Sequence, residues 1–510
     1  MATLFHNAHI RTLGPSGSVD CLLAEEGGHI VAVGEAARAH PLAAGAAAVD
    51  LGGRAVLPGP VDAHVHLLQY AENDLYQADL GGCRTLDELL ERLSAHGKRR
   101  PEGWLLGAGF DHEMFPTHAM PTRADLDRAA PNRPAMVARL CYHVISANSE
   151  ALRLTGIESE SGILSEDRMD PVYAAIPKLT KAQTLEVARH AMALAAKAGF
   201  TGCHVLIASR EEVEAFQTLR ANGELSIRVR MQMPFALFHE LTATGLRTTF
   251  GDEWLSIGGI KMFADGSMGA RTAALTTDYT DDPGNCGELI HPPARLAEMV
   301  REVHDAGCQA VIHAIGDEAM DVAMDAITAA AGENTRAARH RIEHASIVRP
   351  DQVRRLADTG IVCCVQPQFT VTDFWTVQRL GEERKAWIYP FASMLKAGCI
   401  LSGGTDCPVE RLSPLEAIGR AVTRDAPWRG ESISQGYLAD ERLSVEQAWR
   451  LYTTGSAYSG FDEASRGTLE PGMVCDFIAL DADPFTADPK SIETMVPAMT
   501  VVGGRIAPVS

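Results

Sequence analysis

The chain has 510 residues, of which 46% are hydrophobic, and a formal net charge of −20 from 46 basic and 66 acidic residues. This length is too great for one simple core, so we expect more than one substructure. The acidic balance argues against nucleic acid or an anionic membrane as the main partner, because both bind basic surfaces. The sequence leaves open whether the chain forms a homodimer.

The sequence also lacks the features of a secreted or membrane protein. It has no apolar run near about 18 residues, the length that a membrane-spanning helix needs. Its first residues, MATLFHNAHIRTLG, lack the basic and then apolar stretches of a secretion signal. The 11 cysteines are scattered without a C-x-x-C pair, which disfavours disulfides and a structural zinc cluster. We therefore expect a cytoplasmic protein.

The two ends of the chain show the same pattern. Residues 1–55 turn often and alternate between apolar and polar side chains, which predicts short strands. The expected strands are Leu4–Ile10, Ser18–Leu23, His29–Val33 and Ala48–Leu51. After a helix expected at Ser444–Ser456, residues 466–510 return to short strands and turns. We expect one small β-sandwich domain built from residues 1–55 and 466–510.

Residues 67–180 interrupt the main pattern. Leu86–His96 has helical spacing, whereas Trp104–Asp111 and Ala135–Leu140 look like strands. Prolines break much of the remainder into turns. We interpret this stretch as an insertion at about 67–180 within a larger domain of residues 56–465.

From residue 181 onward, helices and strands alternate. The helix Lys181–Ala198 ends at Gly199, and the same order of helix, glycine and strand recurs at Gly307, Gly360 and Gly398. The expected strands are Val56–His66, Phe200–Val205, Ile227–Met233, Leu255–Phe263, Gln309–His313, Arg341–His344, Ile361–Val365 and Cys399–Ser402. Nearly continuous apolar strands are typical of a parallel sheet covered by helices. Eight such strands favour an α/β fold of the (β/α)₈ barrel type. The early strands are not followed by a G-x-G-x-x-G motif, so dinucleotide binding is not indicated.

Polar side chains that suit a metal ion stand near the ends of these strands. Residues two apart on a strand point to the same face, so His64 and His66 project together from the first strand. The other candidates, in strand order, are Lys261, His313, His344 and Asp406. Active sites of such barrels lie at the C-terminal ends of the strands, so we expect these side chains to converge. Imidazole and carboxylate groups are common ligands of zinc and similar ions.

Each candidate also has a purely structural interpretation. A histidine at a strand end can be a buried, hydrogen-bonded side chain. Lys261 can form a buried ion pair with a carboxylate such as Asp265, since an unpaired buried ammonium is costly. Asp406 can cap the next helix. Their joint occurrence on several strands favours a metal centre.

Taken together, these segments resemble the amidohydrolase superfamily, and within it amidohydrolase family 3, the YtcJ-like enzymes. The likeness covers nearly the whole chain and includes LPGPVDAHVHL, IKMFADGSMGARTAAL, HRIEHA, VQPQF and SGGTDCPV. One segment departs from the family, which often has Asp-Gly-His where this chain has Cys141-Tyr142-His143. His143 is retained, so a role in substrate binding remains open to it.

The resemblance implies a centre of two divalent metal ions, with zinc the expected metal. The matching ligands are His64, His66 and Asp406 for the buried ion, and His313 and His344 for the more exposed one. Lys261 matches the bridging lysine, which CO₂ converts to a carbamate in similar enzymes. Asp406 also matches the catalytic group that takes a proton from metal-activated water, which attacks as hydroxide.

The implied activity is hydrolysis of a C–N bond in a small-molecule substrate, namely an amide, a formamide or a cyclic amide. We expect His143 and Gln366 to contact this substrate, His143 at the oxyanion and Gln366 through its amide. Two alternatives stay open. A mononuclear deaminase of the same superfamily is suggested by Glu343 beside His344, although Lys261 counts against it. A non-catalytic assembly protein on the same fold would bind no metal.

Overall fold

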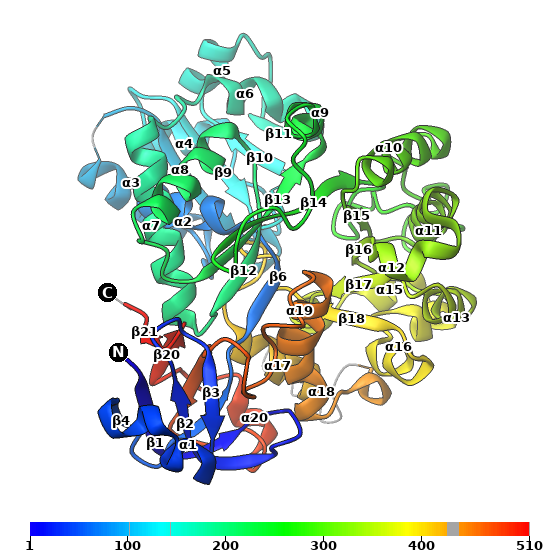
Figure 1. Ribbon diagram of the computed structural model, residues 1–510. Coiled ribbons are helices and arrows are strands. Elements are labelled where there is room, and N and C mark those ends of the chain that lie inside the picture. Colours follow the sequence, from blue (N-terminus) through cyan, green and yellow to red (C-terminus); the bar gives the residue numbers. More distant parts are fainter. Residues whose placement is uncertain (101, 143, 426–437, 509–510) are drawn as a thin grey trace. The chain divides into compact units, whose positions relative to one another are not determined.

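The computed structural model describes residues 1–100, 102–142, 144–425 and 438–508 (Figure 1). The chain divides into two compact units, one of Met1–His66 and Met192–Ser510 and the other of Leu67–Ala191. The first unit contains a barrel and a sheet that both chain ends build, and the second has a sheet of its own. No helix among the described residues combines the length and the apolar character needed to cross a membrane.

Eight strands form the barrel, and neighbours pair in parallel. Their bounds are β6 Val61–Val65, β12 Gly202–Leu206, β13 Arg228–Pro234, β14 Leu255–Phe263, β15 Ala310–Ala314, β16 Arg341–His344, β17 Val362–Val365 and β18 Ile400–Gly403. The segment after the last strand contacts the first strand, where the N–H of Asp406 donates to the His64 carbonyl over 2.8 Å. The predicted (β/α)₈ fold is confirmed.

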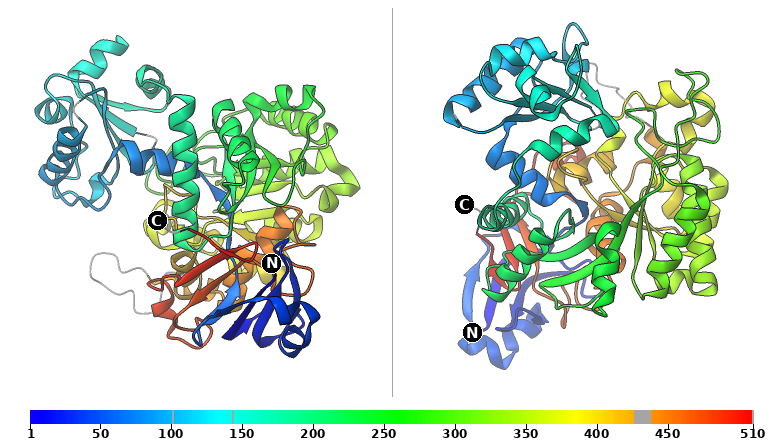
Figure 2. Two further views of the ribbon diagram at one scale, coloured as in Figure 1. Left: turned by 60° about the vertical axis from the view of Figure 1, so that its left-hand side comes forward. Right: turned by 90° about the horizontal axis from the view of Figure 1, so that it is seen from above.

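Helices alternate with these strands along the chain, and those of the first unit flank the barrel (Figure 2). They are α7 Lys181–Ala198, α8 Arg210–Ala221, α9 Phe238–Ala243, α10 Pro293–Asp305, α11 Asp317–Ala331, α12 Thr335–Ala338, α13 Pro350–Thr359, α14 Phe369–Thr372, α15 Thr376–Leu380, α16 Phe391–Ala397 and α17 Pro414–Thr423. Gly360 and Gly398 follow α13 and α16 with φ of 68° and 91°. Residues with a Cβ avoid this left-handed conformation, which explains why glycine ends these helices.

The helix predicted at Ser444–Ser456 is interrupted. It consists of α18 Val445–Arg450, a π-helical turn at Leu451–Gly455 and α19 Ser456–Ser459. A Cβ at Gly455 would approach the carbonyl oxygen of Leu401 to 2.3 Å, so only glycine allows the turn to pack this closely on β18.

Both ends of the chain share one mixed sheet of eight strands, whose blue and red strands lie side by side in Figure 1. The strands are β1 Thr3–Arg11, β2 Ser18–Ala24, β3 Ile30–Val33, β4 Ala47–Asp50, β5 Ala55–Pro58, β19 Phe477–Leu480, β20 Met499–Val502 and β21 Arg505–Ile506. Short helices α1 Glu35–Ala39 and α20 Pro489–Ile492 lie between them in sequence. The rings of Phe5 and Phe477, 5.0 Å apart, join the two chain ends in one core. The predicted β domain from both termini is present, while its exact boundaries stay a prediction.

The strand predicted at Val56–His66 is in fact two strands. β5 pairs with β1 and β19 in the terminal sheet, whereas β6 pairs with β12 in the barrel. The break falls at Gly59, where a Cβ would lie 2.2 Å from the side chain of Thr201. The flanking Pro58 and Pro60 have no N–H to donate to a sheet, so the chain leaves one sheet and enters the other here.

The second unit is built on five strands in the order β11, β10, β9, β8 and β7. Its strands are β7 Ala78–Asp79, β8 Leu105–Phe110, β9 Ala135–Arg139, β10 Val144–Ala147 and β11 Ile163–Ser165, and its helices are α2 Leu67–Tyr76, α3 Leu86–Arg99, α4 Arg123–Ala129, α5 Ser149–Thr155 and α6 Asp170–Ala175. Alternate residues of β9 enter two separate cores, Val137 in one and Met136 in the other. The insertion is thus a folded unit rather than a set of turns.

A buried ion pair links the terminal sheet to the barrel. Asp476 accepts from Nε and an NH2 group of Arg228 on β13 over 2.7 and 3.0 Å, and from the N–H of Gly503 over 2.8 Å. The two charged side chains are 5% and 4% exposed.

We expect Asp476→Ala to lower the free energy of unfolding by about 3–5 kcal/mol, because the buried Arg228 loses its nearest carboxylate and Arg466 loses one too. Urea unfolding followed by circular dichroism measures this. The matched control is Asp481→Ala, which removes a 77% exposed partner of Arg54, and its effect should stay below about 1 kcal/mol. Equal effects of the two variants would contradict the prediction.

Candidate metal centre

The four predicted histidines and Asp406 meet at the C-terminal ends of the barrel strands. The ring centroid of His64 lies 5.8 Å from that of His66 and 4.9 Å from that of His344, and His344 and His313 are 4.5 Å apart. Oδ1 of Asp406 lies 3.2 Å from Nε2 of His64 and 3.5 Å from Nε2 of His66. The predicted convergence of these side chains is what the structure shows.

Three of these residues already have the spacing of a metal site. One donor atom each from His64, His344 and Asp406 lies within 4.8 Å of the other two. The side chain of His64 is 1% exposed, that of Asp406 is 11% exposed and that of His66 is 36% exposed. The group is therefore buried at His64 and open to solvent at His66, as a site that admits a small molecule must be.

The charge state of the histidines suits metal binding. Burial lowers the pKa of His313 to about 3, and it lowers the pKa of His344 well below its usual value. Both rings are therefore neutral at pH 7 and keep a lone pair for a ligand bond. For His64, burial and Lys261 lower the pKa, but Asp406 and Glu343 outweigh them and raise it.

Lys261 is buried in β14, and the ion pair considered for it is not formed. The carboxylate of Asp265 accepts backbone N–H groups of Ala274, Ile315 and Gly316 over 2.8–3.0 Å. Both residues belong to the described part of the chain, and no ion pair joins them there. Burial lowers the pKa of Lys261, which favours the neutral amine.

The helix-capping interpretation of Asp406 is wrong. The next helix, α17, is capped by Ser413, whose hydroxyl accepts from the N–H of Glu416. Asp406 instead has a left-handed backbone with φ of 57°. Gly404 allows this segment to approach the first strand, because a Cβ there would lie 2.6 Å from Cβ of His64.

His344 has a second strained backbone, with φ of 75°. Consecutive residues of a regular strand face opposite sides. Glu343 and His344 nevertheless both contact His64, Glu343 through a hydrogen bond and His344 through its ring. The left-handed turn at His344 resolves this conflict by returning its side chain to the barrel mouth. Strained residues of this kind cluster at functional sites.

Gln366 and His143 are the two residues predicted to contact substrate. Gln366 is 1% exposed, and its Oε1 lies 2.9 Å from Nδ1 of His344. The structure thus places Gln366 against a candidate ligand, and its contact with substrate stays a prediction. His143 lies outside the described residues.

The sequence interpretation missed two charged residues beside the centre. Arg341 on β16 binds both carboxylate oxygens of Glu343. Asp62 on β6 accepts the N–H of His64 over 3.1 Å and both the N–H and the hydroxyl of Thr405, over 3.0 and 2.5 Å, which ties the first strand to the segment after the last. Both are charged residues inside apolar strands, the same signal that singled out Lys261.

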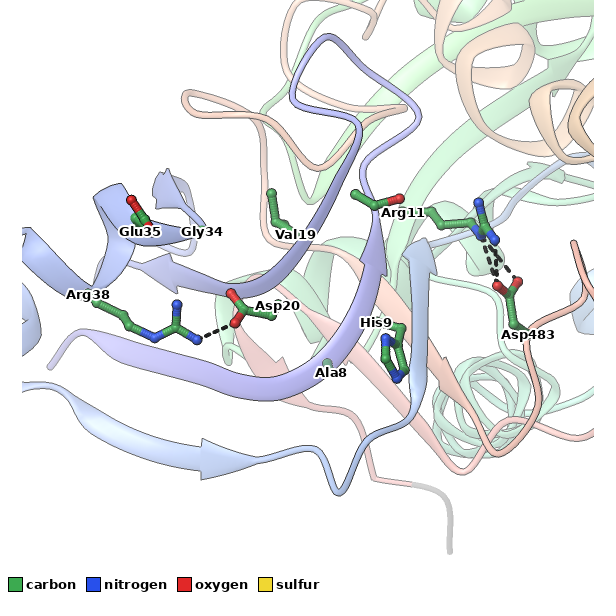
Figure 3. Close-up of a pocket in the computed structure, with 10 residues that line it drawn as sticks. Ala8, His9, Arg11, Val19, Asp20, Gly34, Glu35, Arg38 and Asp483 are labelled. Atoms are coloured by element: carbon green, nitrogen blue, oxygen red, sulfur yellow. Dashed lines mark hydrogen bonds and ion pairs between the residues drawn. The ribbon is translucent and has the colours of Figure 1, made fainter.

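A hollow of about 610 Å³ on the terminal sheet is lined by none of the candidate ligands. In Figure 3 its arginines point to acidic partners: Arg38 bonds Asp20 and Arg11 bonds Asp483. Each of the two arginines is thus paired with a carboxylate of the same hollow.

The amidohydrolase family model matches residues 47–508. The chain belongs to the amidohydrolase family. YtcJ of Bacillus subtilis (strain 168), which is named as an amidohydrolase, is 30% identical over 483 residues, covering 90% of each chain. The N-substituted formamide deformylase of Arthrobacter pascens is 26% identical over 530 residues, covering 98% of this chain and 96% of the relative. The family membership predicted from the motifs is confirmed.

A solved structure agrees with these matches. The crystal structure of an uncharacterized metal-dependent hydrolase from Pyrococcus horikoshii OT3 superposes with a TM-score of 0.83 and 31% identity, covering 96% of this chain and 99% of that one. Together with the family match, this likeness supports a hydrolase that uses a divalent metal and acts on a small molecule.

Proposed function

We propose that this amidohydrolase hydrolyses a C–N bond of a small amide, formamide or cyclic amide. The observation that carries the proposal is that donor atoms of His64, His344 and Asp406 lie within 4.8 Å of one another. The similarity to a deformylase of N-substituted formamides supports formamides as the first class to test.

In this proposal the centre holds two divalent ions, with zinc expected. His64, His66 and Asp406 would hold the buried ion, and His313 and His344 the other. A bound divalent ion lowers the pKa of water and polarises a carbonyl oxygen, so that hydrolysis proceeds at neutral pH.

Lys261 is proposed to carry a carbamate. The neutral amine attacks the carbon of CO₂, an N–C bond forms, and one proton leaves to solvent. The product is an anion with two oxygens, which suits a position between two cations far better than an ammonium does. Burial, which lowers the pKa of Lys261, assists the first step because only the neutral amine is nucleophilic.

Asp406 is proposed as the proton carrier. Its Oδ1 faces His64 and His66, so a second carboxylate oxygen is available to accept a proton from the attacking water. The same proton then goes to the leaving nitrogen, which needs it to depart as a neutral amine.

The contacts of Glu343 weaken the deaminase alternative. Its carboxylate is fully buried and binds Arg341 and His64, so it has no open side for a substrate amine. Ammonia release with one bound metal per chain would nevertheless decide for a deaminase, and a chain that binds no metal would revive the non-catalytic assembly protein.

A substrate panel tests the proposal. Zinc-loaded protein is assayed against N-substituted formamides, N-acyl amines and lactams, and amine release is measured. We expect turnover of at least one class that disappears on chelation and returns with metal. Metal-loaded protein that releases amine from none of the three classes would refute the C–N hydrolase.

A further inference from the structure

Three of the candidate histidine ligands each contact, through one ring nitrogen, an acceptor that is not itself a candidate ligand. Nδ1 of His64 contacts Glu343, Nδ1 of His344 lies 2.9 Å from Oε1 of Gln366, and Nε2 of His313 lies 2.9 Å from the carbonyl oxygen of Gly266. A neutral imidazole that donates from one nitrogen presents the lone pair of the other. These acceptors therefore decide which nitrogen each ring offers.

For His344 and His313 the direction of donation follows from the acceptors. The carbonyl of Gly266 can only accept, so Nε2 of His313 carries the hydrogen. The amide nitrogen of Gln366 lies 3.3 Å from the carbonyl of Cys364, which leaves the amide oxygen facing His344. His344 thus offers Nε2 and His313 offers Nδ1.

For His64 the orientation follows from the neighbours of its two ring nitrogens. Nδ1 contacts Glu343, whose two carboxylate oxygens also accept from Nε and an NH2 group of Arg341 over 2.9 and 2.8 Å, and all of these atoms are buried. Nε2 lies 3.2 Å from Oδ1 of Asp406, a candidate ligand. The contact with Glu343 therefore leaves Nε2 as the nitrogen on the side of the candidate metal site.

The arginine is itself fixed. One NH2 group also donates to the carbonyl of Ala63 over 2.8 Å, and the other nitrogen lies 3.0 Å from Nδ1 of His204. Arg341 on β16 therefore contacts β6 and β12 across the barrel interior. Glu343 is therefore held by an arginine that two strands on the opposite side of the barrel fix.

A competing arrangement uses the same atoms. Donors of His64, Glu343 and Cys364 also lie within 4.8 Å of one another, which allows a second kind of metal site. Both oxygens of Glu343 are occupied by Arg341, however, and burial raises the pKa of the Cys364 thiol well above its usual value. A protonated thiol and a paired carboxylate are poor ligands.

We propose that Glu343, held by Arg341, and Gln366 are positioning residues that fix His64 and His344 with Nε2 directed at the metal, and that neither binds the metal itself. The proposal rests on the metal centre of the proposed function, but on no particular substrate. Outer partners of this kind typically change metal affinity by about 10–100-fold.

The first test is Glu343→Gln, which keeps the size of the side chain. Its amide cannot accept from Arg341 at both positions, because the NH2 group must face a donor. We expect zinc affinity, measured by competition with a chelator, to fall about 10–100-fold. Gln366→Met should also weaken binding, since it removes an acceptor from His344 without adding a charge.

Two controls separate positioning from folding and from direct ligation. Arg341→Met combined with Glu343→Gln leaves no unpaired arginine. The midpoint temperature of unfolding should therefore rise again above that of Glu343→Gln alone, while zinc affinity stays low. Recovery of both would show a purely structural pair and overturn the proposal. Cys364→Ser should leave affinity unchanged, and a thiolate charge-transfer band in the cobalt-loaded protein would instead establish the competing site.

A readout without metal completes the test. In metal-free protein with nitrogen-labelled histidine, NMR should show hydrogen on Nδ1 of His344 and on Nε2 of His313. Other tautomers would overturn the inference even if the enzyme is active. Correct tautomers with normal zinc binding in Glu343→Gln would also overturn it, whereas failure to hydrolyse any amide would affect only the proposed function.

Discussion

Asp406→Asn is expected to lower kcat by at least about 100-fold, because general base catalysis typically contributes about 10²–10⁴-fold. The amide keeps the shape of the carboxylate but cannot accept a proton from water at neutral pH. The backbone contact of residue 406 with His64 does not depend on the side chain, so the strand ends should stay together. The measurement is kcat together with bound metal for both proteins.

The control for this prediction is another buried carboxylate of the same unit. Asp317 is 1% exposed and binds Thr276 and Arg349 at the start of α11. Asp317→Asn should lower stability but leave kcat within a few-fold of the wild type. Near-normal kcat in Asp406→Asn, with metal bound, would remove Asp406 from the mechanism.

The barrel could be predicted because its signals are local. A helix that ends at a glycine before an apolar strand involves only neighbouring residues, and Gly360 and Gly398 have the left-handed φ that this pattern requires. The terminal sheet was predicted less accurately. The pairing of β5 with β19 joins residues over 400 positions apart, and the break at Gly59 depends on contact with Thr201.

The second unit was largely missed for a physical reason. β7 has two residues and β11 has three, too few to show any alternation of apolar and polar side chains. Their conformation is set by pairing with β8 and β10 rather than by their own sequence. The two strands that were predicted, at β8 and β9, are the longest of the sheet.

In the candidate site, the sequence predicted the metal ligands but not the residues that hydrogen-bond to those ligands. His64 and His66 stand out by their spacing on one strand. The contact of His64 with Glu343 spans 279 positions and that of Asp62 with Thr405 spans 343. Which barrel strands become neighbours decides these contacts, and a single sequence does not reveal such pairs. A charged residue inside an apolar strand is the one sequence feature that Arg341 and Asp62 share with Lys261.

That lysine gives the prediction with the largest effect on the metal. Lys261→Met keeps the length of the side chain and the apolar character of β14 but removes the amine that would react with CO₂. We expect metal binding to weaken by more than about 100-fold, beyond what loss of an outer partner costs, and activity to disappear with it. Chelator competition and amine release measure the two effects.

Two comparisons make the lysine prediction specific. Met262→Leu changes a buried neighbour on the same strand and should leave metal binding intact, because such volume-conserving changes are well tolerated. Wild-type protein reconstituted without CO₂ should bind less metal, and isotope-labelled bicarbonate should both restore binding and give a carbamate NMR signal. Since Lys261→Met has no amine, bicarbonate should change nothing in it. Full activity in Lys261→Met would exclude the carbamate, and so would a free amine at Lys261 in a crystal structure of the metal-loaded wild type.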